Sequence, residues 1–175
     1  MKHRLHIEKH VIIIALIAGL FFSSESHAQR ALDSKLTSKV VTSLVQYIKW
    51  EKNSKDQMII CTFGDEDVGK AISALNVPNI SSRITTDIDQ IKSDCNIVYI
   101  GGNEVNNIDA ILWKVKPLDA ATISAIPGFA RMGGMIEIDA NSAKKLKFLI
   151  NVLSAKKSNV VISSDLLSIS SIVKN

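Results

Sequence analysis

The two cysteines are the residues of this sequence with the clearest potential for chemistry. Cys61 lies in an apolar run over residues 58–63, and Cys95 opens another over residues 95–100. Both runs are rich in strand-forming residues, so both are predicted to be buried strands. In an oxidising compartment such a pair normally forms a disulfide, which would be either a structural link or a redox-responsive one, and free buried thiols are the alternative. No C-x-x-C motif is present, which argues against thiol-exchange catalysis.

Histidine, the usual proton shuttle of enzymes at neutral pH, is confined to the start of the chain. All four histidines lie between residues 3 and 27. A chain that loses this segment cannot build a Ser-His-Asp or Cys-His site, and two cysteines alone do not make a usual zinc site. We therefore expect no catalytic residues, no metal site and no cofactor. A hydrolase that works with carboxylates alone remains open.

The first 28 residues are predicted to be a cleaved export signal. Three basic residues precede an apolar run over residues 11–22. That run is too short to cross a hydrocarbon core of ~30 Å as a helix. Ser26-His27-Ala28 fits the small-x-small pattern after which signal peptidase cuts. The mature chain would run from residue 29 to residue 175, and the alternative is an uncleaved N-terminal anchor.

Residues 64–71 resemble a phosphate-binding loop but lack part of its chemistry. They match G-x-x-x-x-G-K-[ST] except that Ala71 stands at the last position, where a hydroxyl would hold Mg²⁺. Three carboxylates, at residues 65–67, would also repel a triphosphate. We expect the acidic start of a helix here instead, and the spacing of a calcium loop is missing.

Gly101-Gly102-Asn103 follows the second cysteine strand and has two interpretations. The glycines could line a small-ligand crevice at the carboxyl edge of the sheet. They could equally form a tight turn from strand to helix. The net charge of the whole sequence, +4, is mild and its basic residues are scattered, so we expect no nucleic-acid partner.

Hydrophobic periodicity predicts an α/β fold over residues 29–175, as one domain with three layers. The first half is expected to be β-α-β-α-β around a mixed sheet, and the second half to add an antiparallel hairpin with one wet face. Right-handed crossovers would place the Cys61 strand beside the Cys95 strand, within disulfide reach. Helices are predicted at about residues 32–49, from the turn at 64–67 to Pro78, and at 108–115, 152–156 and 164–173. Strands are predicted at 58–63, 80–85, 95–100, 121–126, 135–139 and 145–151.

A ten-residue stretch in the C-terminal third carries a family resemblance. Pro127-Gly128-Phe129-Ala130-Arg131-Met132-Gly133-Gly134-Met135-Ile136 resembles the P-G-F-A-x-x-G-G-M-I signature of the YfiR family of exported bacterial proteins. Phe148-Leu149-Ile150-Asn151 fits the strand that follows in that family, and the opening helix likewise closes on Trp50. Some members carry a second cysteine pair in the C-terminal half, which this chain lacks, so a redox switch built on that pair could not operate here.

The resemblance implies regulation by binding rather than catalysis. Proteins of this family resemble periplasmic repressors that bind the periplasmic sensor domain of an inner-membrane diguanylate cyclase. They lower cyclic-di-GMP synthesis and limit biofilm formation, and an outer-membrane lipoprotein relieves the inhibition. The alternative is a periplasmic small-ligand sensor or binding module. The oligomeric state is not fixed by the sequence, and a homodimer is compatible with it.

Four residues of the signature are candidates for a partner-binding surface. Phe129, Arg131, Met132 and Met135 surround the Gly133-Gly134 turn, and methionine adapts well to partner surfaces. The competing interpretation is that Phe129 and its neighbours fill the core while the glycines permit an unusual backbone.

Overall fold

A computed structural model describes residues 33–50, 57–139 and 146–173. The proposed signal segment and the predicted polar turn at Asn141-Ser142 lie outside these ranges. The strands are β1 Ile48–Trp50, β2 Met58–Phe63, β3 Ile80–Thr85, β4 Ile97–Ile100, β5 Ala121–Ser124, β6 Ile136–Asp139, β7 Lys147–Ile150, β8 Val160–Ile162 and β9 Ser171–Ile172. The α-helices are one over residues 33–44, α2 Glu66–Ala74, α3 Ile108–Val115, α4 Val152–Lys157 and α5 Ser164–Ser168. Short 3₁₀ turns are η1 Val45–Tyr47, η2 Ile88–Gln90, η3 Gly102–Asn107 and η4 Lys116–Leu118.

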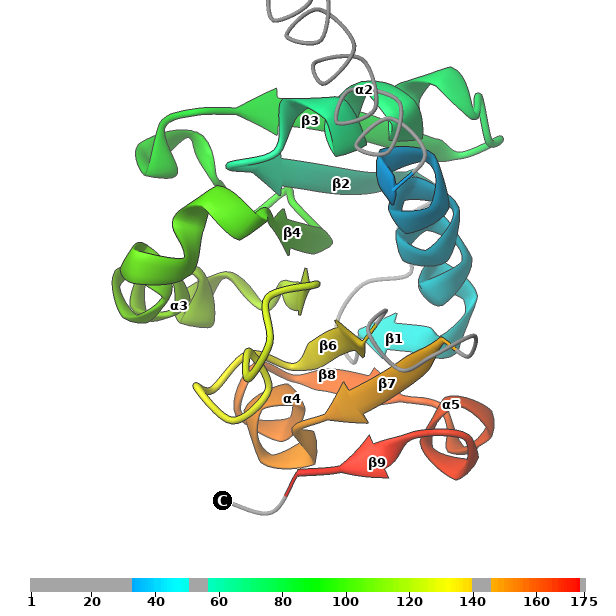
Figure 1. Cartoon of the computed structure of the whole chain (residues 1–175), viewed down its shortest axis with the longest axis vertical. Helices are drawn as coiled ribbons and strands as arrows, with labels where there is room; N and C mark the ends of the chain where they lie inside the picture. Colours follow the sequence, from blue (N-terminus) through cyan, green and yellow to red (C-terminus); the bar gives the residue numbers. More distant parts are fainter. Residues whose placement is uncertain (1–32, 51–56, 140–145, 174–175) are drawn as a thin grey trace, which may run out of the picture.

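Seven strands form one mixed sheet in the order β3-β2-β4-β5-β6-β7-β9. The first five run parallel, β7 pairs antiparallel with β6, and β9 runs parallel to β7. Figure 1 shows these strands stacked from top to bottom, with β1 and β8 beside them. The mixed α/β fold, the parallel first half and the antiparallel β6–β7 hairpin were all predicted from the sequence and are confirmed.

Side chains of the parallel strands alternate between two cores, one on each face of the sheet. Ile60 of β2 belongs to the first core, which the helix over residues 33–44 and α2 cover. Cys61 belongs to the second core, which α3 covers. In Figure 1 the helix over residues 33–44 and α3 lie on opposite sides of the strands. The strands read as continuous apolar runs because both of their faces are buried.

Two predicted helices are shorter in the structure than periodicity suggested. The first ends at residue 44, and β1 then pairs antiparallel with β8, which the sequence did not predict. The last ends at Ser168 and is followed by β9. The hydroxyls of Ser168 and Ser170 donate to the carbonyls of Asp165 and Leu166, and such local bonds compete with helix continuation.

The β6–β7 hairpin has the predicted pairing but not the predicted wet face on β6. Ile136 and Ile138 enter the first core, as alternation suggests. Glu137, between them, is only 6% exposed because the segment before β6 folds over it. The opposite face of β6 is therefore buried as well.

Within the described ranges, no helix has the length and apolar character needed to cross a membrane.

Candidate functional site

The loop over residues 127–134, here called the signature loop, connects β5 to β6 beside α3 and α4 (Figure 1, yellow). The four residues predicted to bind a partner are divided between its inside and its surface. Phe129 is fully buried in the second core, and Met135, just after the loop, is buried in the first core. Arg131 is exposed and Met132 is 40% exposed. Only Arg131 and Met132 are therefore available on the surface to a partner.

A buried carboxylate holds the first half of the signature loop. Oε1 of Glu137 accepts a hydrogen bond from the Gly128 backbone amide at 2.9 Å, and Oε2 accepts one from the Ala130 amide at 3.1 Å. Both backbone donors would otherwise be left unpaired next to the sheet. Because hydrogen bonds to a carboxylate are stronger than neutral ones, Glu137 acts as a clamp that shapes the loop.

Asn151 joins the signature loop to α4. Its side-chain amide donates to the Ala130 carbonyl at 2.8 Å, and its Oδ1 accepts from the Ser154 amide at 3.0 Å, which caps α4. Its own backbone amide donates to the Met135 carbonyl at 2.9 Å. One buried side chain thus fixes the position of the loop relative to the helix that follows the hairpin.

Glycines give the signature loop its path. Gly128 and Gly133 have φ of +84° and +105°, where other residues are strained. A Cβ added at Gly134 would overlap the ring of Phe129. The loop is thus held from within by Phe129 and presents Arg131 and Met132 outward.

A cavity of about 300 Å³ lies between the signature loop, α3 and α4. Trp113 stands at its edge and is 80% exposed, an unusual state for so large an apolar side chain. The lining combines apolar, hydroxyl and charged groups: Asp109, Leu112, Trp113, Val115, Lys116, Ala120, Thr122, Met132, Gly133, Met135, Ser154, Lys157 and Ser158. Met132 and Met135, two of the candidates for a partner-binding surface, both line this cavity.

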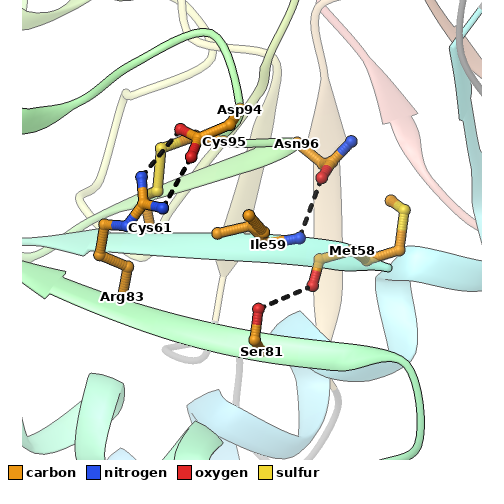
Figure 2. Close-up of polar contacts among 8 residues, drawn as sticks. All are labelled: Met58, Ile59, Cys61, Ser81, Arg83, Asp94, Cys95 and Asn96. Carbon is orange, nitrogen blue, oxygen red and sulfur yellow. Dashed lines mark hydrogen bonds and ion pairs between the residues drawn. A yellow bond between two sulfur atoms is a disulfide. The ribbon is translucent and has the colours of Figure 1, made fainter. Parts of the chain in front are cut away.

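The two cysteines form a disulfide, Cys61–Cys95, with a Cα–Cα distance of 5.7 Å. As Figure 2 shows, it lies beside a bidentate ion pair in which Arg83 of β3 contacts Asp94 at 2.8 and 2.7 Å. The hydrogen bond that Arg83 donates to Asp94 raises the pKa of the guanidinium, which stays protonated. The covalent link joins β2 to the segment before β4, and the ion pair joins β3 to that same segment.

The phosphate-loop-like stretch is a helix start, as its acidic composition suggested. Asp65 caps α2 by accepting from the Val68 amide at 3.1 Å. Lys70 pairs with Glu66 on the exposed helix face at 2.7 Å. Gly69, the second glycine of the motif, is buried against the side chains of Ile84 and Thr62.

The two glycines after β4 differ in how much space surrounds them. Gly101 donates to the Phe63 carbonyl at 2.8 Å, and a Cβ there would overlap the backbone of Gly64. Gly102 has open space around its Cα. The first glycine thus permits the close approach of the β2 and β4 ends, with its own backbone extended.

Sequence reasoning missed the two residues that organise the site, Glu137 and Asn151. Glu137 stands between two isoleucines and alternation placed it in water. Asn151 follows β7 directly before a helical stretch, and an asparagine at that position is a common cap, which is the signal that could have identified it. Within the described parts of the chain, no group of three or more His, Cys, Asp or Glu residues is arranged to hold a metal ion.

Comparison with known proteins gives a family match and several remote structural matches. No curated protein matches the chain. A conserved domain protein from Vibrio cholerae O1 biovar El Tor superposes with a TM-score of 0.57 at 9% identity, over 81% of this chain and 60% of that one. An ABC domain from Streptococcus pneumonia, in complex with L-Trp, superposes with a TM-score of 0.51 at 8% identity, over 80% of this chain and 60% of that one.

At such identities the two structures support the fold alone, and this chain spans less than two thirds of either. The family match is more informative because it covers most of the described residues. The model of the YfiR/HmsC-like family matches residues 34–171, which include the disulfide, the signature loop, Glu137 and Asn151. The chain belongs to the YfiR/HmsC-like family.

Proposed function

We propose that this protein is a periplasmic repressor that binds the periplasmic sensor domain of an inner-membrane diguanylate cyclase and lowers cyclic-di-GMP synthesis. The observation that carries the proposal is the family match over residues 34–171, since this family is one of periplasmic regulators of diguanylate cyclase signalling. The cleaved export signal predicted over residues 1–28 and the disulfide are compatible with that compartment.

The surface proposed for the cyclase is formed by Arg131 and Met132 of the signature loop together with Trp113 of α3. Trp113 and Met132 line the same cavity, so they are neighbours on one face. Tryptophan, arginine and methionine are enriched at protein interfaces. The loop is fixed by Glu137 and Asn151, so little conformational entropy would be lost when a partner binds.

The signature loop is also used internally, in a way that suits binding more than catalysis. The buried carboxylate that contacts it, Glu137 of β6, accepts hydrogen bonds from two backbone amides of the loop and therefore has a structural role. Regulation by a shaped surface needs no reacting group. An outer-membrane lipoprotein that competes for the protein would relieve the repression.

Affinity capture from solubilised inner membranes tests the proposal. The tagged, exported protein, in oxidised and in reduced form, should retain a diguanylate cyclase that has a periplasmic domain. Recovery of no cyclase in either form would overturn the proposal. Deletion of the gene should raise cyclic-di-GMP, and an unchanged level would count equally against it.

Matched variants then test the surface. Met132→Asp should weaken binding of the captured cyclase domain at least tenfold, because a charge would be buried at the contact. Leu36→Asp is the control: Leu36 is 53% exposed, on the helix over residues 33–44, across the sheet from α3. Circular dichroism and urea unfolding should show both variants folded. Equal effects of the two changes would contradict the assignment of the surface.

A further inference from the structure

We infer that the cavity between α3, the signature loop and α4 is a binding site for a small apolar anion, such as an aryl-substituted or medium-chain carboxylate. This goes beyond the proposed function, because it assigns an effector site to the protein itself. The volume of about 300 Å³ lies at the lower end of the range of ligand pockets. It suits a small metabolite rather than a nucleotide.

The body of the cavity is apolar. Leu112, Trp113 and Val115 contribute from α3, and Met132 contributes from the signature loop. Ligand pockets are typically built from apolar and aromatic side chains with a few polar groups that fix orientation. The exposed indole of Trp113 provides a face that a bound apolar group would cover.

The polar groups favour an anion. Lys116 follows α3 and Lys157 ends α4, and both residues line this cavity and the adjoining hollow, so two cationic side chains come to the cavity from two elements. Among the described residues neither lysine forms an ion pair, whereas Lys114 in the adjoining hollow is paired with Asp89 at 2.6 Å. Two uncommitted cations beside an apolar cavity are the arrangement that holds a carboxylate.

Two acidic residues lie near the cavity, but their positions still allow an anion to bind between the lysines. Asp119 lines the adjoining hollow together with Lys116 and Lys157 but does not line the cavity itself, and its carboxylate accepts a hydrogen bond from Asn159 at 3.0 Å. Asp109 lines the cavity itself, but it lies in the first turn of α3, seven residues before Lys116. At 1.5 Å per residue the two positions are about 10 Å apart along the helix. We therefore place the carboxylate of the ligand at the Lys116–Lys157 end and its apolar body toward Leu112 and Met132.

Titration of the purified protein with 3-phenylpropanoate and octanoate, compared with the neutral isostere 3-phenylpropanamide, tests the inference. Calorimetry gives the affinity. Fluorescence of Trp113 gives its location, in a Trp50→Phe background that leaves Trp113 as the reporter. At least one of the two carboxylates should bind saturably and shift the Trp113 emission to shorter wavelength. The amide should bind at least fivefold more weakly than 3-phenylpropanoate if that acid binds.

Variants that remove a charge test whether the lysines bind the carboxylate. Lys116→Gln and Lys157→Gln should each weaken carboxylate binding at least threefold, and together at least tenfold. Lys70→Gln, on α2 across the sheet, is the matched control and should leave the affinity unchanged. Asp109→Asn should leave it unchanged or improve it, because a like charge is removed.

Several results would overturn the inference: no saturable binding of either carboxylate, equal binding of the acid and the amide, or lysine variants that bind as the wild type does. A loss in Asp109→Asn as large as in the lysine variants would overturn the orientation. Since no cyclase is present in these titrations, their failure leaves the proposed function untouched, and failure of the membrane capture leaves this site untouched.

Discussion

The carboxylate of Glu137 accepts a hydrogen bond at 2.9 Å from the backbone amide of Gly128, which lies nine positions earlier in the sequence. β6, the strand that follows the signature loop, therefore supplies the carboxylate that fixes the position of the first residues of the loop. The buried carboxylate has a second partner in the Ala130 amide, and the loop is braced again from α4 by Asn151.

Replacing Glu137 should destabilise the protein more than replacing an exposed carboxylate. Glu137→Gln retains the shape but one of its two terminal atoms becomes a donor, which faces a backbone donor. We expect a loss of about 1–3 kcal/mol in the free energy of unfolding. Glu66→Gln, which breaks the exposed pair with Lys70, should cost clearly less, because solvent screens that pair. Urea unfolding measures both, and equal losses would contradict the role of the clamp.

Substitution of the two glycines after β4 should have unequal effects. Gly101→Ala would force a Cβ against the Gly64 backbone, so we expect a loss of about 1–3 kcal/mol in stability. Gly102→Ala meets open space, and we expect a change within about 1 kcal/mol. Thermal and urea unfolding of the two variants make the comparison. A costly Gly102→Ala together with a neutral Gly101→Ala would refute the packing explanation.

Removing the disulfide should lower stability without changing the fold. The link closes a loop with a sequence separation of 34, and the paired Cys61→Ala and Cys95→Ala substitutions should cost about 3–4 kcal/mol. Wild-type protein unfolded under reducing conditions should show a similar loss. The near-ultraviolet circular dichroism of the double variant should remain native. A loss below about 1 kcal/mol would contradict the expected restriction of the unfolded chain by the link.

The stability of the protein should decrease at alkaline pH because of Tyr99. Burial, and secondarily the negative charge of Asp65, raise the pKa of Tyr99 above its ordinary value. The folded state therefore keeps the phenol proton after the unfolded state loses it, above about pH 10. Stability is unaffected below that pH and falls by up to about 1.4 kcal/mol per unit above it.

Tyr99→Phe isolates this effect from the titration of lysines. The difference in unfolding free energy between wild type and Tyr99→Phe should be constant from pH 7 to about pH 9.5 and change steadily above pH 10, in favour of the phenylalanine variant. A difference that is independent of pH up to 11 would show that Tyr99 ionises freely in the folded protein.

The parts of the fold that depend on local pattern could be predicted, and those that depend on distant partners could not. The adjacency of the Cys61 and Cys95 segments followed from crossover rules and is present as the β2–β4 pair. β1 was missed because Ile48 continues the apolar spacing of the preceding helix. Only pairing with β8, far along the chain, makes Ile48–Trp50 a strand.

The sequence motif located the candidate site, but it did not predict which side chains of the site are buried and which are exposed. The glycines and Phe129 identified the loop. Which of the four candidate side chains would be exposed depended on how the loop folds back over β6. That path is set by Glu137 and Asn151, whose hydrogen-bond partners are backbone amides and a backbone carbonyl. Every residue has such backbone groups, so the sequence does not indicate which of them a side chain will bind.

The antiparallel pairing of Ile48 with Ile162 joins residues from near the two ends of the described chain. A polypeptide that emerges from a translocation channel with its N-terminus first cannot complete this ribbon until almost its whole length has crossed. Contacts of such long range slow folding. In the export route proposed above, the apolar side of the helix over residues 33–44 would therefore stay uncovered until the C-terminal strands arrive.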